Sequence, residues 1–427
     1  VFPSSETLIT FYARLTYAVG CVRSTIPSMC TSSEPPPPGN LALIAIIREE
    51  IAACGGRMPF ARFMELALYQ PVHGYYLAPE RRPGRGGDFL TAPEVHPFFG
   101  FALARQIAEC WERLDRPASF VVREYGAGVG GLAYDVIAGL SEERPELAAA
   151  LHYQLLEPNQ HRRRQAMAAM AEAGLAGRVS AADPATVADQ APITGVILAN
   201  EVADALPVHR LIVREATLKE CYVRWDDGED GFAEVEAAPS DPALAASLRQ
   251  DLLHQGVAPR EGDRLDVSPA AAAWFGDVAA GLERGYAIII DYGYAAPELY
   301  RDHRLTGTLR GYTEHTVNDD PFRLVGLQDL TAHVDFTALE RAGQAAGLVT
   351  AGLTTQGAFL ASVGLGDFLV RLQQEPETDP ATYYRAQAAV FRLIDPGGMG
   401  RFSVLLMAKD APVEPPLLGL REAPPGF

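Results

Sequence analysis

The sequence predicts an α/β fold built around a mainly parallel β-sheet. The first observation is the stretch 119–138, SFVVREYGAGVGGLAYDVIA, which has the pattern of a buried strand, a glycine-rich turn and a helix. The second is a series of short apolar runs separated by stretches with helical spacing, typical of parallel strands, near residues 120, 152, 180, 195 and 286. The third is a pair of late apolar runs, near residues 349 and 403, which indicates an antiparallel end to the sheet.

The first 39 residues differ from the rest of the chain and contain the proline run Pro35–Pro38. Such a run forms an extended linker rather than a packed fold, so we expect residues 1–39 to be a disordered or artefactual extension. One hypothesis is that the native protein begins near Met29. Arginines among serines and threonines in this segment also fit a transit peptide, which would direct the protein to the mitochondrial matrix. Otherwise we expect a bacterial cytoplasmic protein.

Changes of pattern divide the remaining chain into three regions. Residues 40–118 are expected to form an N-terminal helical cap that carries a Gly-Asp-Phe loop. Residues 119–410 are expected to form the α/β core, with insertions at 207–267, where residues alternate as in antiparallel strands, and at 300–335. The Pro- and Gly-rich residues 411–427 are expected to be a flexible tail.

Composition argues against several classes of function. The formal net charge of −18 argues against a general nucleic-acid binder. No uninterrupted apolar run approaches the roughly 18 residues of a membrane span, so we expect no integral membrane segment. The five cysteines form no Cys-x-x-Cys pair and no cluster with histidines, so we predict reduced thiols and no metal site.

The glycine turn after the first predicted strand fits two ligand-binding templates. Gly126, Gly128 and Gly131 match the G-x-G-x-x-G of dinucleotide-binding folds. Glu124, Gly126, Gly128 and Gly130 match the acid-x-G-x-G-x-G of class I methyltransferases, which use S-adenosyl-L-methionine. A carboxylate before the turn suits the cationic amino group and sulfonium of that cofactor, whereas it would repel a pyrophosphate. The acid favours the methyltransferase interpretation, while the glycines alone also fit a tight turn without a ligand.

Two further acids follow the next predicted strands. Glu157 ends the apolar run 151–157, where nucleotide-binding α/β folds place the carboxylate that binds ribose hydroxyls. Asp183 follows the short strand that begins at Val179. It either reaches the adenine amino group of a bound nucleotide or is an ordinary loop acid.

Three polar residues, Asn200, Glu201 and Asp204, leave the carboxyl end of the strand 195–199. Open α/β sheets keep their chemistry at this edge. Three polar groups exceed what a helix cap requires, so we interpret them as functional.

Together these stretches resemble the MidA family of class I methyltransferases over roughly residues 40–410. That family includes the mitochondrial complex I assembly factor, which methylates an arginine of a complex I subunit. The resemblance rests on residues 63–69 with 73–76, 87–91 with 93–94 and 99–100, 124–128, 200–201 with 204–207, and 328–336. Val202 and Ala203 depart from it, because the family carries bulkier, often aromatic residues there.

The resemblance implies a Rossmann-like sheet of seven strands with an antiparallel last strand, and S-adenosyl-L-methionine as the cofactor. It also implies that Gly87, Asp88 and Thr91 form a flap over that cofactor. In this interpretation Glu124 holds the amino-acid end of the cofactor and Glu157 binds its ribose. The turn itself is shaped by Gly126, Gly128 and Gly130.

The activity implied is protein-arginine N-methylation of a respiratory complex I subunit. Glu201 and Asp204 are then candidates to orient the guanidinium, with Asn200 as an orienting residue. Two alternatives stay open: a methyltransferase for a small molecule or another protein side chain, and an assembly chaperone that binds the cofactor with little turnover. A nicotinamide dehydrogenase is disfavoured by Glu124 and by the antiparallel end of the sheet.

Overall fold

The centre of the structure is a mostly parallel sheet. This computed structural model describes residues 39–79, 90–187, 190–254, 256–300, 306–314, 316–376 and 378–422. Seven strands within these residues form the sheet: β2 (Phe120–Tyr125), β3 (Leu151–Leu156), β4 (Val179–Ala182), β5 (Ile193–Asn200), β10 (Leu282–Asp291), β16 (Val349–Thr355) and β17 (Ser403–Lys409). Their order is β16-β17-β10-β5-β2-β3-β4. Only β17 runs antiparallel to its neighbours, which confirms the predicted fold class.

Side chains of the central strands are buried on both faces of the sheet, as parallel strands between helices require. Ile288 and Ile290 of β10 pack into one hydrophobic cluster, and Ala287 and Ile289 pack into the opposite one. This alternation follows from the two-residue period of a strand. It explains why strand β10 has an uninterrupted apolar run in the sequence.

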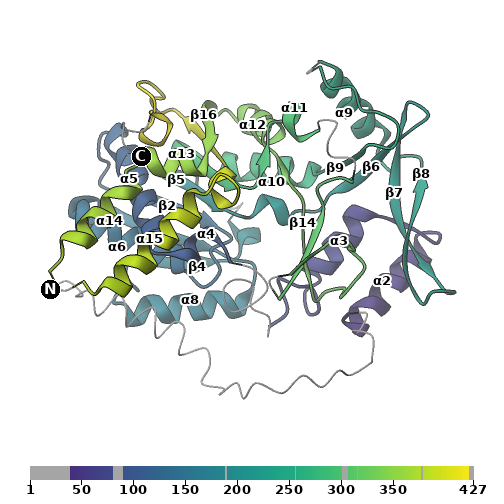
Figure 1. Cartoon of the computed structure of the whole chain (residues 1–427), viewed down its shortest axis with the longest axis horizontal. Coiled ribbons are helices and arrows are strands. Elements are labelled where there is room, and N and C mark those ends of the chain that lie inside the picture. Colours follow the sequence, from purple (N-terminus) through teal and green to yellow (C-terminus); the bar gives the residue numbers. More distant parts are fainter. Residues whose placement is uncertain are drawn as a thin grey trace.

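Helices cover both faces of this sheet (Figure 1). The first cluster contains side chains of α5 (Phe98–Arg113), α6 (Gly131–Glu143), α7 (Pro145–Ala150), α8 (Gln160–Glu172), α13 (Gln356–Ser362), α14 (Leu365–Gln374) and α15 (Pro380–Ile394), together with the short α4 (Ala92–Val95). The second contains side chains of α10 (Pro269–Ala280) and α12 (Phe336–Ala345). No helix within the described ranges is both long and apolar enough to span a membrane.

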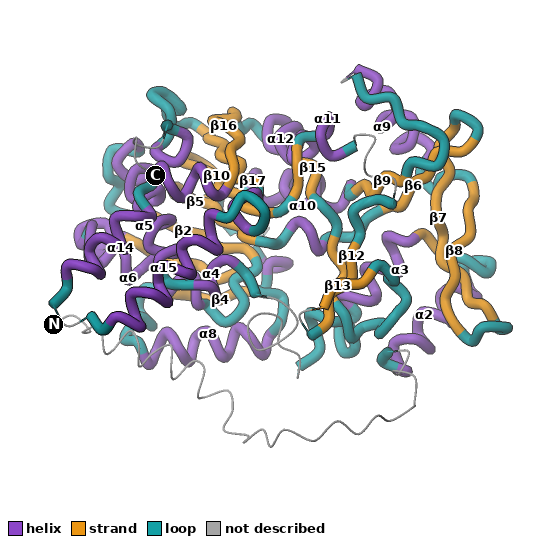
Figure 2. The backbone as a smooth tube through the Cα atoms, in the orientation of Figure 1, coloured by secondary structure: helices purple, strands orange, loops and turns teal. Residues whose placement is uncertain are grey.

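A second body lies beside the sheet and is richer in short strands (Figure 2). We call it the cap from here on, and its residues differ from the 40–118 expected for the N-terminal helical cap. Its sheet has the order β1-β7-β6-β9, with β8 paired to β7, and a smaller sheet has the order β13-β12-β14. The bounds are α2 (Leu41–Ala53), β1 (Met58–Pro59), α3 (Phe60–Tyr69), β6 (His209–Arg214), β7 (Thr217–Asp226), β8 (Gly231–Ala237), α9 (Pro242–His254), β9 (Arg264–Val267), α11 (Ala296–Leu299), β12 (Arg310–Thr313), β13 (Thr316–Asn318) and β14 (Asp329–Thr331). Short pieces lie between the two bodies: β11 (Gly293–Tyr294), β15 (Val334–Asp335) and the 3₁₀ turn η2 (Ala203–Ala205). The other 3₁₀ turns follow or precede elements of the main sheet and its helices: η1 (Pro184–Thr186), η3 (Met399–Arg401) and η4 (Leu418–Leu420).

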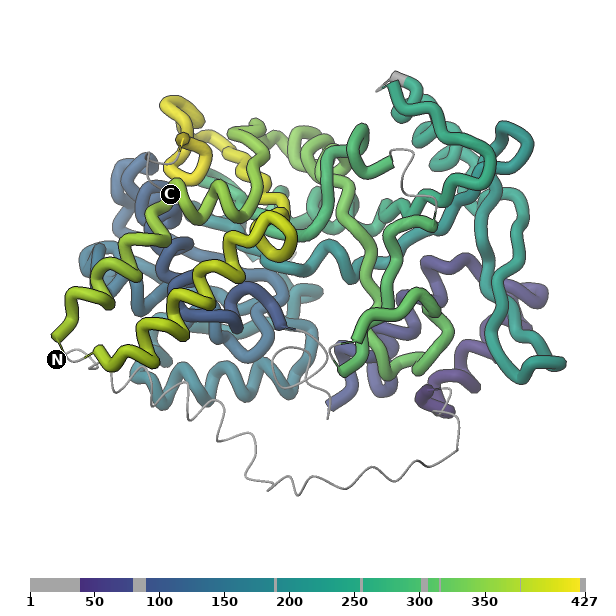
Figure 3. The backbone as a smooth tube through the Cα atoms, viewed as in Figure 1, coloured from purple at the N-terminus to yellow at the C-terminus, as the bar shows by residue number. Residues whose placement is uncertain are grey.

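The cap is built from segments that are far apart in the sequence (Figure 3). Phe60 and Phe63 of α3 share a hydrophobic core with Val223 of β7 and Leu330 of β14. The N-terminal helices therefore pack with the two insertions, whereas α5, which the sequence analysis placed in the same region as α2 and α3, packs on the main sheet.

Apolar side chains of the C-terminal segment pack on the core as far as Leu420, which differs from the flexible tail expected for residues 411–427. Leu417 is fully buried. The backbone N–H of Gly419 donates to Oε1 of Gln106 at 2.8 Å, and the N–H of Leu418 donates to Oε2 of Glu109 at 2.6 Å. Apolar side chains of α5 and α13 explain the difference, since they cover this segment. The expectation for residues 1–38 lies outside the described residues.

Gly195 lets three central strands come together at one level. It lies opposite Val121 of β2 and Gly285 of β10, and its φ is +154°. A Cβ added at Gly195 would lie 1.9 Å from the carbonyl oxygen of Val121, and a Cβ added at Gly285 would lie 1.9 Å from the carbonyl oxygen of Gly195. Any side chain here would force neighbouring strands apart.

We expect Gly195→Ala to lower the free energy of unfolding by about 3 kcal/mol or more, because backbone atoms cannot yield to the new methyl group. Urea unfolding followed by circular dichroism measures the effect. Gly177→Ala is the matched control, because its added Cβ meets nothing within 4 Å, and it should change stability by less than about 0.5 kcal/mol. Equal stabilities of the two variants would contradict this account.

Candidate functional site

The carboxyl ends of β2, β3, β5 and β10 meet at one edge of the sheet, and the predicted site residues follow these strands. The glycine turn, residues 126–130, comes first. Gly126, Gly128 and Gly130 have φ values of +69°, +54° and +82°, a conformation that favours glycine. The N–H groups of Gly126 and Ala127 donate to the carbonyl of Leu156 at 2.8 and 3.2 Å. The turn is therefore fixed to the end of β3.

Space beside this turn is open to a ligand. A Cβ added at Gly128 would meet no atom within 4 Å, and Gly130 is the residue before the first turn of α6. Backbone N–H groups at a helix start carry partial positive charge and lack intrahelical partners. A polar ligand can approach the backbone closely here, so the turn fits the predicted cofactor.

Glu157 connects the glycine turn to the segment after β3. Its Oε2 accepts the N–H of Gly128 at 3.0 Å, and its Oε1 accepts the N–H of Asn159 at 2.9 Å. Burial raises the pKa of this carboxyl, while Arg162, with Nη1 at 3.6 Å from Oε1, opposes the shift. The carboxylate is thus held next to the turn, as a ribose-binding group would have to be.

Glu124 lies deeper, on β2 itself. Its Oε2 accepts a hydrogen bond from the hydroxyl of Tyr153 on the neighbouring strand at 2.9 Å. Burial raises the pKa of Glu124 to about 8, and the charge of Glu157 acts in the same direction. A cationic group bound at the turn would favour the ionised form of this carboxyl.

The other residues predicted to contact the cofactor have structural partners of their own. Oδ1 of Asp183 accepts the N–H of Ala185, capping η1, and Oδ2 lies 3.2 Å from Nη1 of Arg163. Thr91 begins α4, and its hydroxyl donates to Oε2 of Glu94 at 3.0 Å. Gly87 and Asp88, predicted to form a flap with Thr91, lie outside the described residues.

The second group of predicted residues lies on the acceptor loop, which we define as residues 200–206. Asn200 ends β5, and Glu201 follows with a φ of +53°, which is unusual for a residue with a side chain. Oε1 of Glu201 accepts hydrogen bonds from Nδ2 of Asn200 and from the N–H of Ala92, both at 3.0 Å. Burial raises the pKa of Glu201 to about 8. One of its oxygens therefore joins the loop to α4.

Asp204 is 6% exposed, and its Oδ1 has no hydrogen-bond partner among the described residues. Burial raises its pKa to about 6, although the hydroxyl of Tyr292 favours the ionised form. A buried oxygen without a donor is costly. This atom is a natural contact for a positively charged ligand.

Asp291, at the end of β10, holds the acceptor loop in place, and the sequence analysis did not select it. Its Oδ2 accepts the N–H groups of Val202, Ala203 and Asp204 at 3.1, 2.9 and 3.2 Å. Oδ1 accepts the N–H of Tyr292 at 2.9 Å. Burial raises the pKa of Asp291, and the charge of Asp204 adds to this. The sequence did carry one signal for this residue, since Asp291 is an acid at the end of an otherwise apolar strand.

Val202 joins the two halves of the site. A Cβ added at Gly126 would lie 2.6 Å from Cγ2 of Val202, so the acceptor loop touches the glycine turn. This residue is one of the two that depart from the family pattern. Its small side chain fits against the turn without a clash.

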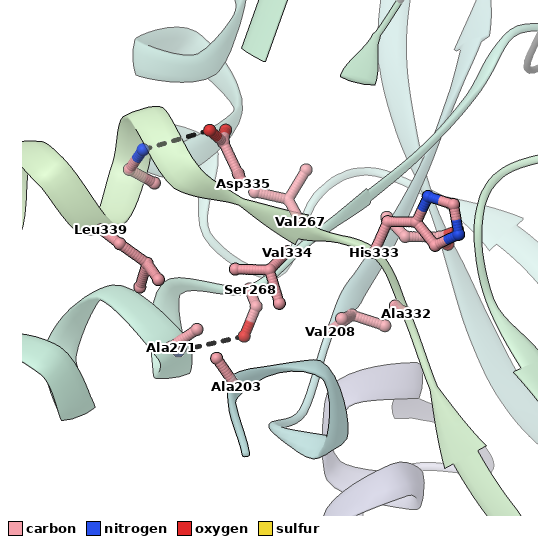
Figure 4. Close-up of a pocket in the computed structure, with 12 residues that line it drawn as sticks. Ala203, Val208, Val267, Ser268, Ala271, Ala332, His333, Val334, Asp335 and Leu339 are labelled. Atoms are coloured by element: carbon pink, nitrogen blue, oxygen red, sulfur yellow. Dashed lines mark hydrogen bonds between the residues drawn. The ribbon is translucent and has the colours of Figure 1, made fainter. Parts of the chain in front are cut away.

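Two cavities lie near the acceptor loop. One, of about 30 Å³, is enclosed behind η2 and lined mainly by apolar groups, with Ser268 and Asp335 bonded to helix N–H groups (Figure 4). It has room for about one water molecule and cannot hold a nucleotide. The other is an open groove of about 570 Å³ beside Tyr69, Leu206 and Pro207. In the described part of the chain, no cluster of His, Cys, Asp or Glu has a metal-binding arrangement.

Comparison with known proteins agrees with this geometry. A model of a family described as S-adenosyl-L-methionine-dependent methyltransferase matches residues 102–354. The chain is 27% identical over 402 residues to the protein arginine methyltransferase NDUFAF7 homolog, mitochondrial, of Drosophila melanogaster, covering 86% of this chain and 85% of the relative. It is 24% identical over 364 residues to the protein arginine methyltransferase NDUFAF7, mitochondrial, of Homo sapiens, covering 81% and 78%.

Solved structures with the same architecture exist. A COG1565 superfamily member from Burkholderia thailandensis, crystallised with S-adenosyl-homocysteine, superposes with a TM-score of 0.79 at 34% identity, covering 90% of this chain and 96% of that chain. A native structure of a COG1565 superfamily protein from the same organism gives a TM-score of 0.78 at 33% identity, with the same coverage. The likeness extends over nearly the whole of both chains.

We expect Glu157→Ala to weaken binding of S-adenosyl-homocysteine at least about tenfold, because the variant loses a charged hydrogen-bonding group at the turn. Calorimetric titration measures this, with NAD as a ligand that should not bind. Glu229→Ala, in the exposed turn between β7 and β8, is the control and should bind as wild type does. Asp183→Ala tests the other predicted acid, whose side chain is 35% exposed. Unchanged affinity in Glu157→Ala would remove the ribose assignment, whereas a loss in Asp183→Ala would assign that acid to the adenine.

Proposed function

Since this chain belongs to the family of S-adenosyl-L-methionine-dependent methyltransferases, we propose that it methylates an arginine side chain of a protein. The observation that carries the proposal is the placement of Glu201 and Asp204. Asp204 is buried and Glu201 is partly buried, and both lie on one loop that touches the glycine turn through Val202. An acceptor held by them would lie next to the cofactor turn.

The chemistry requires positioning more than bond activation by the protein. When bound, the cofactor would supply a methyl group carried on its sulfonium. The acceptor nitrogen would form a bond to the methyl carbon in line as the bond between that carbon and sulfur breaks, so that S-adenosyl-homocysteine leaves and the nitrogen loses one proton to solvent. A guanidinium carries its charge throughout the physiological range and offers five N–H donors in one plane. Carboxylates bind it bidentately and stabilise its charge as the nitrogen attacks. Glu201 and Asp204 supply such oxygens, and Asn200 fixes Glu201.

Electrostatics favours a cation over a neutral acceptor. The charge of Asp204 raises the pKa of Glu201, and the charges of both raise the pKa of Asp291. The carboxyls are destabilised as anions by burial and mutual repulsion, so a bound cation relieves both. A neutral acceptor would leave this repulsion in place.

The described activity of the relatives supports a more specific proposal for the substrate. Those proteins are described as mitochondrial protein arginine methyltransferases, and the family resemblance implies a complex I subunit as the substrate. We propose the same substrate class for this chain. The protein would then act where complex I is assembled, in the bacterial cytoplasm or the mitochondrial matrix.

The first test incubates the protein with methyl-labelled cofactor and respiratory membrane extract, and identifies labelled peptides by tandem mass spectrometry. We expect methylated arginine on a complex I subunit. Label on another side chain or on a small molecule would show that the acceptor is not arginine. Tight cofactor binding without methyl transfer would indicate a cofactor-binding chaperone.

Glu201→Gln should lower kcat about a hundredfold or more, because the charge opposite the guanidinium is lost. Glutamine keeps an oxygen for the N–H of Ala92, so affinity for S-adenosyl-homocysteine should remain that of wild type. Glu229→Gln, in the exposed turn between β7 and β8, is the matched control. Full turnover in Glu201→Gln would remove this residue from the catalytic assignment.

The pH profile gives an independent check. Glu201 and Asp204 must be ionised to hold the cation, and burial raises their pKa values to about 8 and about 6. Hence kcat/KM for the acceptor should rise with increasing pH across this interval, since it reports the free enzyme. In Glu201→Gln the rise near pH 8 should disappear. A profile that falls with pH would contradict the requirement for carboxylates.

A further inference from the structure

Four tyrosines lie close enough to Asp204 to be affected by its charge, and they come from different elements of the chain. Tyr69 ends α3, Tyr76 follows it in a turn, Tyr292 follows β10, and Tyr312 lies on β12. All four are half-buried, so each keeps some exposed surface. Burial raises the pKa of each hydroxyl, and the negative charge of Asp204 raises it further. We call this set the tyrosine pocket.

Tyr69 and Tyr76 form one wall. The rings of Tyr69 and Tyr76 stack with centroids 5.5 Å apart and planes tilted by 22°. The hydroxyl of Tyr69 donates to the carbonyl of Ala205 at 3.1 Å, and that of Tyr76 donates to both carboxylate oxygens of Asp329 at 2.9 Å. Asp329 is almost fully buried on β14. Each hydroxyl thus donates its hydrogen bond to a protein oxygen and keeps lone pairs that can accept a hydrogen bond from a ligand.

This wall is tied to both halves of the site. The carbonyl of Tyr76 accepts from Nδ2 of Asn159 and from Nη2 of Arg162, both at 2.9 Å. Asn159 also donates its N–H to Glu157. On the other side, the N–H of Ala332 donates to the carbonyl of Asp204 at 2.9 Å. The tyrosines therefore lie between the cofactor-binding edge and the acceptor loop.

The guanidinium of Arg162 already lies near the wall, but it does not pair with Asp204. The guanidinium carbon of Arg162 lies 6.0 Å from the centroid of the Tyr76 ring. That side chain is engaged by Glu157 and by the carbonyl of Tyr76. It gives no hydrogen bond to Oδ1 of Asp204, which still lacks a donor.

We propose that the tyrosine pocket binds the guanidinium of the acceptor arginine, with Oδ1 of Asp204 as its charged partner and Asp329 as the positioning residue that fixes Tyr76. The inference rests on the proposed function and names the residues that select its substrate. Aromatic faces attract a cation, hydroxyl oxygens accept its N–H groups, and the unpaired carboxylate oxygen takes a further one. A neutral group of the same shape would gain neither the ring attraction nor the ionic contact.

Calorimetric titration of the protein saturated with S-adenosyl-homocysteine tests the pocket. The probes are the peptide acetyl-Gly-Arg-Gly-amide and the same peptide with citrulline, a neutral side chain of matching shape. We expect the arginine peptide to bind and the citrulline peptide to bind at least about fivefold more weakly. Tyr76→Leu should weaken arginine binding at least about fivefold. Tyr76→Phe, which keeps the ring but not the bond to Asp329, should show a smaller loss.

Tyr384→Leu on α15 is the matched control, because that ring is 64% exposed and α15 carries none of the four tyrosines of the pocket. Affinity for S-adenosyl-homocysteine, measured in every variant, shows that each is folded. Equal arginine binding by wild type and Tyr76→Leu would overturn the pocket, as would equal binding of the two peptides or binding of neither. The labelled residue identified by mass spectrometry decides separately whether the proposed function stands, so the two failures are distinguishable.

Discussion

The site depends on one buried carboxylate that accepts backbone hydrogen bonds from a neighbouring loop. Asp291 receives three consecutive N–H groups of the acceptor loop on a single oxygen. Without this contact, the start of η2 would have unpaired donors in an apolar environment, which is costly. Because Asp291 belongs to the central strand β10, its hydrogen bonds attach the loop to the sheet and restrict the movement of the loop. Asp204 and Glu201 are consequently held against the glycine turn.

Rigidity of the sheet itself comes from strands that are apolar on both faces and closely paired. Gly195 and Gly285 permit that pairing at the point where β2, β5 and β10 lie side by side. The cap adds the opposite wall of the site. Its core joins the N-terminal helices to two insertions, so the tyrosines on α3 and β12 are held by packing between segments remote in sequence.

Charge would make the proposed site selective for cations. Several acids gather at one edge of the sheet, and burial raises their pKa values. Such a group of carboxyls is unfavourable in isolation and becomes favourable when a cation binds. The cofactor sulfonium and a guanidinium are both cations. The same electrostatic arrangement therefore serves the donor and the proposed acceptor.

The sequence by itself determined the α/β fold, the glycine turn and the acids that end strands, because these follow from local periodicity and from the positive φ that glycine allows. It predicted Glu157, Glu201 and Asp204 as site residues through their positions after apolar runs. Only the tertiary structure decided that Asp291 holds the acceptor loop, that Tyr69, Tyr76 and Tyr312 lie within reach of the charge of Asp204, and that apolar side chains of residues 411–420 pack on the core. Each of these depends on contacts between segments far apart in the chain, for which no local pattern carries a signal.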